Sequence, residues 1–257
     1  MRAFHLPLAL CALAAPHASA SAQSTGNRTY ANPIDLDYKY NFEQLNLGIS
    51  YRTSADPVIV NHKGEYFLFA TLVGGWWHSR DLITWRLVVP SKWPFEDMVA
   101  PAARSVRDTL YLFQSTTIPK PIVFSTKPET GQLEFYNRLL PSPPGAQSPF
   151  TQTPPTPGAV PPGPWDPDIF HDADTDKWYM YWNSSNFYPL FGIELDKSRR
   201  LIYVGTPVPL ISLHPDRHGW ERFGQDHRET RVPFIEGAWM TKHAGKYYLQ
   251  YAAPGTE

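Results

Sequence analysis

The chain has 257 residues, which is long enough for one large all-β domain or two small ones. Aromatic residues make up 14% of the sequence and there are 27 prolines, a combination that favours short strands and stiff loops over a helical protein. The formal net charge of −1 excludes the strongly basic surface expected of a protein that binds nucleic acid or an anionic membrane.

The first residues follow the pattern of a secretory signal peptide. Met1-Arg2 supplies the charged start, Leu6 to Ala15 the apolar run, and Ala18-Ser19-Ala20 a small-residue cleavage site. We therefore assign residues 1–22 to a signal peptide and expect a secreted, extracellular protein, or a periplasmic one in a bacterial host. The single cysteine, Cys11, lies in this segment, so the mature chain would hold no disulfide. The apolar run is too short for a membrane span, and no later run is long enough.

The next part of the chain predicts a repeat of short strands. Residues 23–50 show no clear periodicity, and we expect an extended lead-in there. From residue 56 onward, alternating apolar and polar positions with turns about every 8 to 12 residues predict two successive four-stranded antiparallel sheets. Their strands are expected at 56–60, 65–71, 74–78 and 84–89, and at 100–106, 109–115, 122–125 and 133–138. The two units open 44 residues apart, a spacing typical of propeller blades.

A proline-rich segment separates the second unit from the third. Ten of the 25 residues in 141–165 are proline, which predicts an extended, exposed insertion that packs into no core. Without it, the 66-residue interval between Ala100 and Asp166 shortens to 41, back at the blade period. The third unit runs from Asp166 to about Ser212, and the polar and aromatic loop through residues 214–220 suits the rim of a site.

The fourth unit opens at Glu236 and contains two strands before the sequence ends at Glu257. We therefore predict that residues 23–257 form one incomplete β-propeller domain with about three and a half blades. Such a number of blades cannot close a propeller and hide its edges. The chain is then a fragment or a truncated gene model, or the repeat interpretation is incorrect.

Carboxylates occupy the opening position of three of the four units: Asp56, Asp166 and Glu236. The first strand of each propeller blade is the innermost, so these side chains should meet in one central pocket. Mutual repulsion and desolvation would then raise at least one pKa. A glycosidase needs this arrangement, with a protonated acid for the leaving oxygen and an ionised base for water.

Simpler roles for the acidic residues stay open. An Asp-Pro pair is a common turn opener, so each of these aspartates could serve merely to cap a turn. Asp168 lies two residues after Asp166, on the same face of the predicted strand, and the sequence does not separate their roles. Asp172, Asp174 and Asp176 alternate like a calcium loop but lack its following glycine and distal glutamate, which favours a hairpin turn.

Five motifs occur in order and at blade spacing: Ser54-Ala55-Asp56-Pro57, Ser79-Arg80-Asp81-Leu82-Ile83-Thr84-Trp85, Val99-Ala100-Pro101-Ala102, Trp165-Asp166-Pro167-Asp168 and Ile235-Glu236-Gly237-Ala238-Trp239. With these motifs, the chain from about residue 45 to its end resembles glycoside hydrolase family 43, the five-bladed β-propeller arabinofuranosidases and xylosidases. The resemblance implies Asp56 as general base, Glu236 as general acid, and Asp166 as the residue that tunes the acid's pKa and orients substrate. It also implies inversion without a redox cofactor, and some members of the family carry a calcium ion near the axis. The proline-rich insertion and the missing closing strands depart from the family pattern.

Trp76, Trp77, Asn183 and Trp239 are candidate substrate-binding residues, because sugar subsites combine aromatic platforms with a few polar groups. Core packing is the alternative for each tryptophan. The seven histidines after the signal segment show no zinc-binding spacing, so no metal ligand is assigned.

The sequence thus predicts a secreted, monomeric, inverting glycosidase that cleaves arabinofuranosyl or xylosyl linkages in plant cell-wall polysaccharide. Its partner is a polysaccharide or oligosaccharide, and it needs no cofactor, with a structural calcium left open. The alternatives are a non-catalytic propeller that binds glycans and an inactive truncated fragment.

Overall fold

A computed structural model describes residues 36–38, 43–44, 49–50, 54–93, 99–115, 120–140, 142–146, 159–161 and 163–255. The predicted signal peptide and most of the lead-in lie outside these residues. Two short strands in the lead-in, β1 (Glu43–Gln44) and β2 (Ile49–Ser50), pair with each other, an element that the sequence analysis did not predict. Within the described residues, no helix has the length and apolar character needed to cross a membrane.

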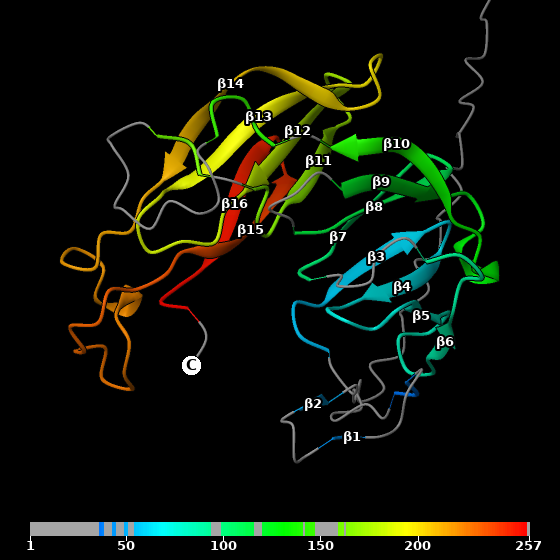
Figure 1. Cartoon of the computed structure of the whole chain (residues 1–257), viewed down its shortest axis with the longest axis horizontal. Helices are drawn as coiled ribbons and strands as arrows, with labels where there is room; N and C mark the ends of the chain where they lie inside the picture. Colours follow the sequence, from blue (N-terminus) through cyan, green and yellow to red (C-terminus); the bar gives the residue numbers. More distant parts are fainter. Residues whose placement is uncertain are drawn as a thin grey trace, which may run out of the picture. The chain divides into compact units, whose positions relative to one another are not determined.

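Three antiparallel sheets of four consecutive strands follow, and then a hairpin (Figure 1). We call them blades 1 to 4. Blade 1 comprises β3 (Val58–His62), β4 (Glu65–Phe69), β5 (Trp76–Ser79) and β6 (Arg86–Val88), and blade 2 comprises β7 (Ala102–Val106), β8 (Thr109–Phe113), β9 (Lys120–Ser125) and β10 (Glu134–Leu140). Blade 3 comprises β11 (Asp168–Asp172), β12 (Lys177–Trp182), β13 (Leu190–Asp196) and β14 (Ile202–Ile211), and blade 4 comprises β15 (Glu236–His243) and β16 (Lys246–Ala252).

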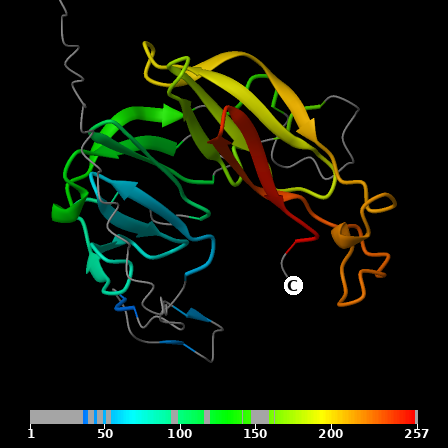
Figure 2. The same cartoon turned by 180° about the vertical axis from the view of Figure 1, so that it is seen from behind.

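The first strands of the blades lie next to one another, as the repeat interpretation predicts. Strand β7 contacts both β3 and β11, and β11 in turn contacts β15. Figure 2 shows the same succession of sheets from behind. Side chains at the starts of these four strands are therefore brought together, although the strands are far apart in the sequence.

Strand β8 of blade 2 is buried on both faces, which explains its continuous apolar run. Successive side chains of a strand point to opposite faces of a sheet. On β8, Leu110 and Leu112 pack into the core shared with blade 1, whereas Tyr111 and Phe113 pack into the core shared with blade 3. A strand with two buried faces therefore shows no alternation of apolar and polar residues.

The proline-rich segment is partly packed, which corrects the expectation of a wholly exposed insertion. Val160 is only 9% exposed and joins the core between blades 2 and 3, and Ala146 pairs with it through an isolated bridge. Burial of the apolar side chains of Ala146 and Val160 is favoured because it removes apolar surface from water. Residues 147–158 lie outside the described residues.

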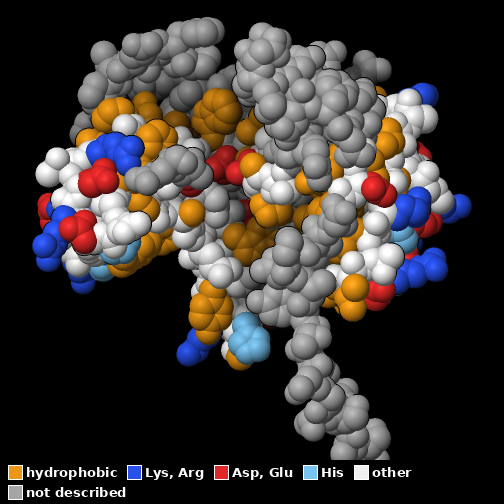
Figure 3. Space-filling model, turned by 90° about the horizontal axis from the view of Figure 1, so that it is seen from below, with side chains coloured by type: hydrophobic (Ala, Val, Ile, Leu, Met, Phe, Trp, Pro, Cys, Tyr) orange, Lys and Arg blue, Asp and Glu red, His pale blue; other side chains and the backbone are white. Residues whose placement is uncertain are grey.

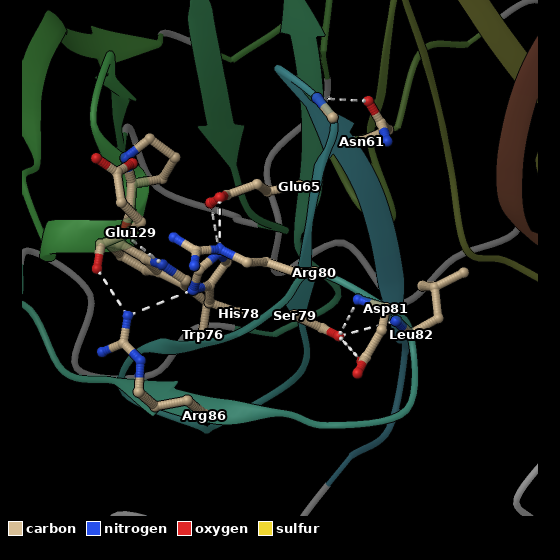
Figure 4. A network of polar contacts seen from close by, with 12 residues as sticks. Asn61, Glu65, Trp76, His78, Ser79, Arg80, Asp81, Leu82, Arg86 and Glu129 are labelled. Atoms are coloured by element: carbon tan, nitrogen blue, oxygen red, sulfur yellow. Dashed lines mark hydrogen bonds and ion pairs between the residues drawn. The ribbon is translucent and has the colours of Figure 1, made fainter.

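The motif Ser79–Trp85 forms the turn between β5 and β6 (Figure 4). The Ser79 hydroxyl accepts the N–H groups of Asp81 and Leu82, at 3.2 and 2.9 Å. The Asp81 carboxylate accepts those of Thr84 and Ile83, at 2.7 and 2.9 Å, and these bonds lower the pKa of Asp81 to about 2. The role of this motif is therefore to fix a tight turn.

Candidate active site

The opening residues of blades 1, 2 and 3 share an unusual backbone. Asp56, Ala100 and Asp166 have φ angles of 51°, 43° and 43°, in the left-handed region that residues other than glycine seldom adopt. A pleated strand cannot include such a residue, so β3, β7 and β11 each begin two residues later than the predicted opening position.

The same backbone hydrogen bond closes each of these three openings. The N–H groups of Thr71, Ser115 and Asn183 donate to the carbonyl oxygens of Ala55, Val99 and Trp165, each at 2.9 Å. The accepting residue directly precedes the left-handed one in every case. The three positions are therefore structurally equivalent, as the sequence repeat predicts.

A pocket of about 320 Å³ lies where these openings meet. All four blades contribute to its lining: Asp56, Pro57, Val58, Ile59, Ala100, Pro101, Asp166, Pro167, Gly237, Ala238 and Trp239. On the face seen from below, acidic side chains gather in a hollow flanked by apolar ones (Figure 3). A site with an apolar wall and a few converging polar groups is typical of small-ligand and sugar binding.

Asp56 lies at the exposed side of this pocket. The Thr71 hydroxyl donates to its Oδ2 atom at 2.5 Å. The same hydroxyl oxygen accepts the N–H of Ala100 at 2.9 Å. The carboxylate is thus held in one orientation while it remains open to solvent.

Asp166 is half-buried and has an elevated pKa. Its Oδ1 accepts the Ser115 hydroxyl at 3.2 Å, and its Oδ2 accepts the Gly237 N–H at 3.3 Å. Burial, followed by the negative charges of Glu236 and Asp56, raises the pKa of Asp166 to about 6. The three carboxyl groups therefore act on one another, as their equivalent positions suggest.

Glu236 is the first residue of β15 and is half-buried. The Ser184 hydroxyl donates to its Oε2 at 3.2 Å. Blade 4 differs slightly from the other blades, because the left-handed residue there is Gly237, with φ 64°, one position after the acid. The structure nevertheless brings Glu236 close enough to Asp166 for its charge to be felt there.

Asp168 has a different environment from Asp166, which resolves the ambiguity in the sequence. It is fully buried, and both of its oxygens accept hydrogen bonds from the Arg104 guanidinium at 2.8 Å. The Met240 N–H also donates to Oδ2, at 2.7 Å. Burial raises the pKa of Asp168, while Arg104 and this N–H favour the ionised form. Asp168 therefore belongs to a buried ion pair beside the pocket.

Of the four predicted substrate-binding residues, only Trp239 lines the pocket. The Arg104 guanidinium carbon lies 3.8 Å from the centre of the Trp239 ring system, a cation–π contact that fixes the ring. Trp76 and Trp77 are at most 1% exposed, and their indole N–H groups donate to the carbonyl oxygens of Pro128 and Asp37. A buried indole cannot stack on a sugar, so these two assignments are corrected.

Asn183 is also buried, at 0% exposure, and does not line the pocket. Its Nδ2 donates to the carbonyl oxygens of Tyr188 and Pro189, at 3.2 and 2.8 Å, which fixes the loop after β12. The expectation of a sugar contact there is corrected as well.

Sequence reasoning missed the hydroxyl groups that hold the acids: Thr71, Ser115 and Ser184. A signal existed for two of them, because Thr71 and Ser115 each follow the opening residue of their unit by 15 positions. No pattern in the sequence pointed to Arg104. Its partners Asp168 and Met240 lie 64 and 136 residues away.

The segment 173–176 forms the turn between β11 and β12, as predicted. Asp172, at the end of β11, accepts hydrogen bonds from Lys242 and Tyr247 of blade 4, and these contacts lower the pKa of Asp172. Among the described residues, no group of three or more His, Cys, Asp or Glu side chains is arranged to hold a metal ion.

Several solved structures with a similar fold are glycoside hydrolases. A xylan beta-1,4-xylosidase from Bacillus halodurans C-125 is 19% identical with a TM-score of 0.53, and the match covers 79% of this chain and 38% of that one. A thermostable family-43 glycoside hydrolase is 22% identical with a TM-score of 0.55, covering 88% and 67%. A family 43 endo-arabinanase from Bacillus licheniformis is 17% identical with a TM-score of 0.54, covering 77% and 64%. The chain thus spans between 38% and 67% of the length of these three proteins.

The likeness to these structures confirms the predicted all-β fold of the five-bladed propeller type, and the described residues form three four-stranded blades and a two-stranded fourth. No curated protein sequence matches the chain. The family model described as "Glycosyl hydrolases family 43" matches residues 49–257, about four fifths of the sequence. The chain belongs to this family.

Proposed function

We propose that this chain carries the catalytic acids of an inverting glycosidase that cleaves arabinofuranosyl or xylosyl linkages in plant cell-wall polysaccharide. The main support is the pocket to which three blades contribute Asp56, Asp166 and the backbone beside Glu236. The xylosidase and endo-arabinanase activities in the names of the structural neighbours indicate the substrate class. The pocket is built from a single chain, so we also propose a monomer.

In the proposed mechanism, Glu236 donates its proton to the glycosidic oxygen as the bond from the anomeric carbon to that oxygen breaks. Asp56 takes a proton from a water molecule, whose oxygen forms the new bond to the anomeric carbon from the opposite face. The product therefore has the inverted configuration. Asp166, with its pKa raised to about 6, lies beside Glu236 and tunes the charge of the site. These steps need no redox cofactor.

The signal-like residues 1–22 support export, which would bring the enzyme to extracellular polysaccharide. A structural calcium near the axis, which the family resemblance allows, has no part in the proposed steps. Chelation by EDTA followed by an assay and a thermal melt would measure any contribution from a bound ion.

The test is to replace Asp56 by Asn and Glu236 by Gln, and to measure release of sugar from arabino- and xylo-oligosaccharides, whose alkoxide leaving groups need protonation by a general acid. Loss of a general acid or base costs about 10²–10⁴-fold in rate, so both variants should be nearly inactive while their thermal unfolding changes little. Asp108→Asn, in the exposed turn between β7 and β8, is the matched control and should keep full activity.

NMR of the first sugar released should show the inverted anomer. Retained activity in either Asp56→Asn or Glu236→Gln would contradict the assignment of roles. Binding of arabinan or xylan without release of sugar by the wild-type chain would instead support a glycan-binding propeller.

A further inference from the structure

The Thr71 hydroxyl connects the candidate base to the neighbouring blade. Thr71 follows β4 and is only 9% exposed. Its backbone N–H donates to the Ala55 carbonyl oxygen of its own blade. Its side-chain oxygen accepts the N–H of Ala100, the opening residue of blade 2. The residue is therefore anchored on both sides before its interaction with Asp56 is considered.

These anchors fix the direction of the remaining hydrogen bond. A hydroxyl group has one hydrogen to donate and two lone pairs that accept. Because the Ala100 N–H occupies a lone pair, the hydroxyl hydrogen is directed to Oδ2 of Asp56, 2.5 Å away. Asp56 accepts this bond, which holds its carboxyl group in one orientation.

Blade 2 repeats the device at its junction with blade 3. Ser115 occupies the position equivalent to Thr71, and its oxygen accepts the N–H of Asp166 at 2.7 Å. The same hydroxyl lies 3.2 Å from Oδ1 of Asp166. The contact with the N–H of the next blade's opening residue therefore occurs at both positions. The acid that is held differs, because Thr71 binds the aspartate of its own blade and Ser115 binds that of the next blade.

We infer that Thr71 is a positioning residue for hydrolysis, which orients the Asp56 carboxylate toward the attacking water and ties it to blade 2. This inference rests on the function proposed above. Misplacement of a reacting group by about 1 Å can cost on the order of 10²-fold in rate. Removal of the hydroxyl should therefore lower kcat and leave KM nearly unchanged, because Thr71 does not line the pocket.

The experiment compares Thr71→Val, Thr71→Ser and Thr175→Val with wild type, on the full chain and with an aryl glycoside. Valine has nearly the shape of threonine without the hydroxyl, whereas serine keeps the hydroxyl. Thr175 is the matched control, because its hydroxyl donates to Asp172 at 2.9 Å at the opposite end of β11. We expect kcat to fall about 10- to 100-fold in Thr71→Val, to recover to within about threefold of wild type in Thr71→Ser, and to stay unchanged in Thr175→Val.

The outcomes separate this inference from the proposed function. If Asp56→Asn is inactive and Thr71→Val keeps wild-type kcat, the positioning role is overturned while the proposed function stands. If Asp56→Asn stays active, both fall. A loss in Thr71→Val that matches only its loss of folded protein, measured by the thermal melt, would show a structural role and overturn the inference. A fall in kcat with an unchanged melt, together with recovery in Thr71→Ser, supports it.

Discussion

Individual residues at the blade openings combine backbone strain with candidate chemistry. The left-handed conformation of Asp56 and Asp166 costs roughly 1–2 kcal/mol for a residue with a side chain, although Asp tolerates it better than most. Ala100 adopts the same conformation without carrying a carboxylate. The strain therefore belongs to the way a blade opens, and the side chain at that position decides what the opening can do chemically.

The elevated pKa of Asp166 predicts that this residue lowers stability at neutral pH. Its pKa of about 6 in the folded chain lies above the ordinary value of 3.8. The protonated carboxyl therefore contributes stability that is complete below about pH 4 and is lost as the pH rises through 6. Above pH 6, the free energy of unfolding of Asp166→Asn should exceed that of wild type by about 1–2 kcal/mol, after allowance for solvent at the pocket mouth. Its unfolding temperature should be correspondingly higher.

Thermal melts from pH 4 to pH 8 test this prediction. The advantage of Asp166→Asn should vanish near pH 4, and its hydrolytic activity should be reduced throughout, a trade-off between stability and function. Asp226→Asn removes an exposed carboxyl from the loop after blade 3 and should show no such pH dependence. A difference between Asp166→Asn and wild type that does not change with pH would contradict the assignment of the raised pKa.

Among the elements, strands β7, β11 and β15 are joined by one arginine. The Arg104 guanidinium contacts the Asp168 carboxylate on β11 and the Met240 carbonyl oxygen on β15, and it also stacks on Trp239. Asp168 reciprocates by accepting the Met240 N–H. This arrangement sets the position of β15, and hence of Glu236, relative to the strand that follows Asp166.

Breaking the Arg104–Asp168 pair should be costly. Asp168→Asn leaves the partly buried Arg104 guanidinium without its counter-charge. Loss of one partner of a fully buried ion pair destabilises proteins by about 3–5 kcal/mol, so a cost toward the lower end of this range is expected. Asp108→Asn removes the partner of Lys63 in an exposed pair with an N–O distance of 3.8 Å and should cost less than about 1 kcal/mol. Chemical denaturation followed by tryptophan fluorescence compares the two. Equal free energies of unfolding for the two variants would show that the Arg104–Asp168 pair does not stabilise the contact between the blades.

The strands themselves could be predicted from periodicity and turn signals, and each predicted strand of blades 1 and 2 overlaps an observed one. The errors have physical causes. Strands β3 and β7 begin two residues later than predicted, because the sequence pattern does not reveal the positive φ angles of Asp56 and Ala100. The burial of Val160 does not follow from the sequence, because a proline-rich composition does not show which apolar side chains reach a core.

At the scale of the whole molecule, blade 2 acts as a layer between two cores. The core shared with blade 1 contains Leu112, and the core shared with blade 3 contains Phe113. These neighbours in the sequence therefore stabilise different interfaces. A residue in either core depends on side chains from another blade, so blade 2 cannot lose one neighbour without exposing a large apolar face.

Truncation of either residue should destabilise the entire chain. Leu112→Ala should cost about 2–5 kcal/mol and Phe113→Ala about 3–5 kcal/mol, because each leaves a cavity in a packed core. Ile83→Ala, at a turn position that is 61% exposed, should stay within about 0.5 kcal/mol of wild type. Thermal melts by circular dichroism measure all three. We expect a single cooperative transition, with a lower midpoint temperature in both core variants than in wild type. Two separate transitions would show that the blades unfold independently.

The candidate acids could be found from the sequence because they occur at equivalent positions of a repeat, and a repeat makes distant residues comparable. The groups around them could not be found in this way. Whether Asp168 is a second pocket acid or an ion-pair partner depends on Arg104, a residue of another blade. The same holds for Trp76, whose place in the core depends on the carbonyl oxygen of Pro128, 52 residues away.

The arrangement of the strands has a consequence for the order of folding. Each sheet that the structure describes joins strands that are consecutive in the chain, so the backbone pairing of each blade closes short loops. The contacts of Arg104 with Met240, across 136 residues, close long ones. The entropic cost of closing a loop grows with its length. The strands of each blade should therefore pair early in folding, and the contacts between blades should form late. The pocket, which takes residues from every blade, would then be the last part to assemble.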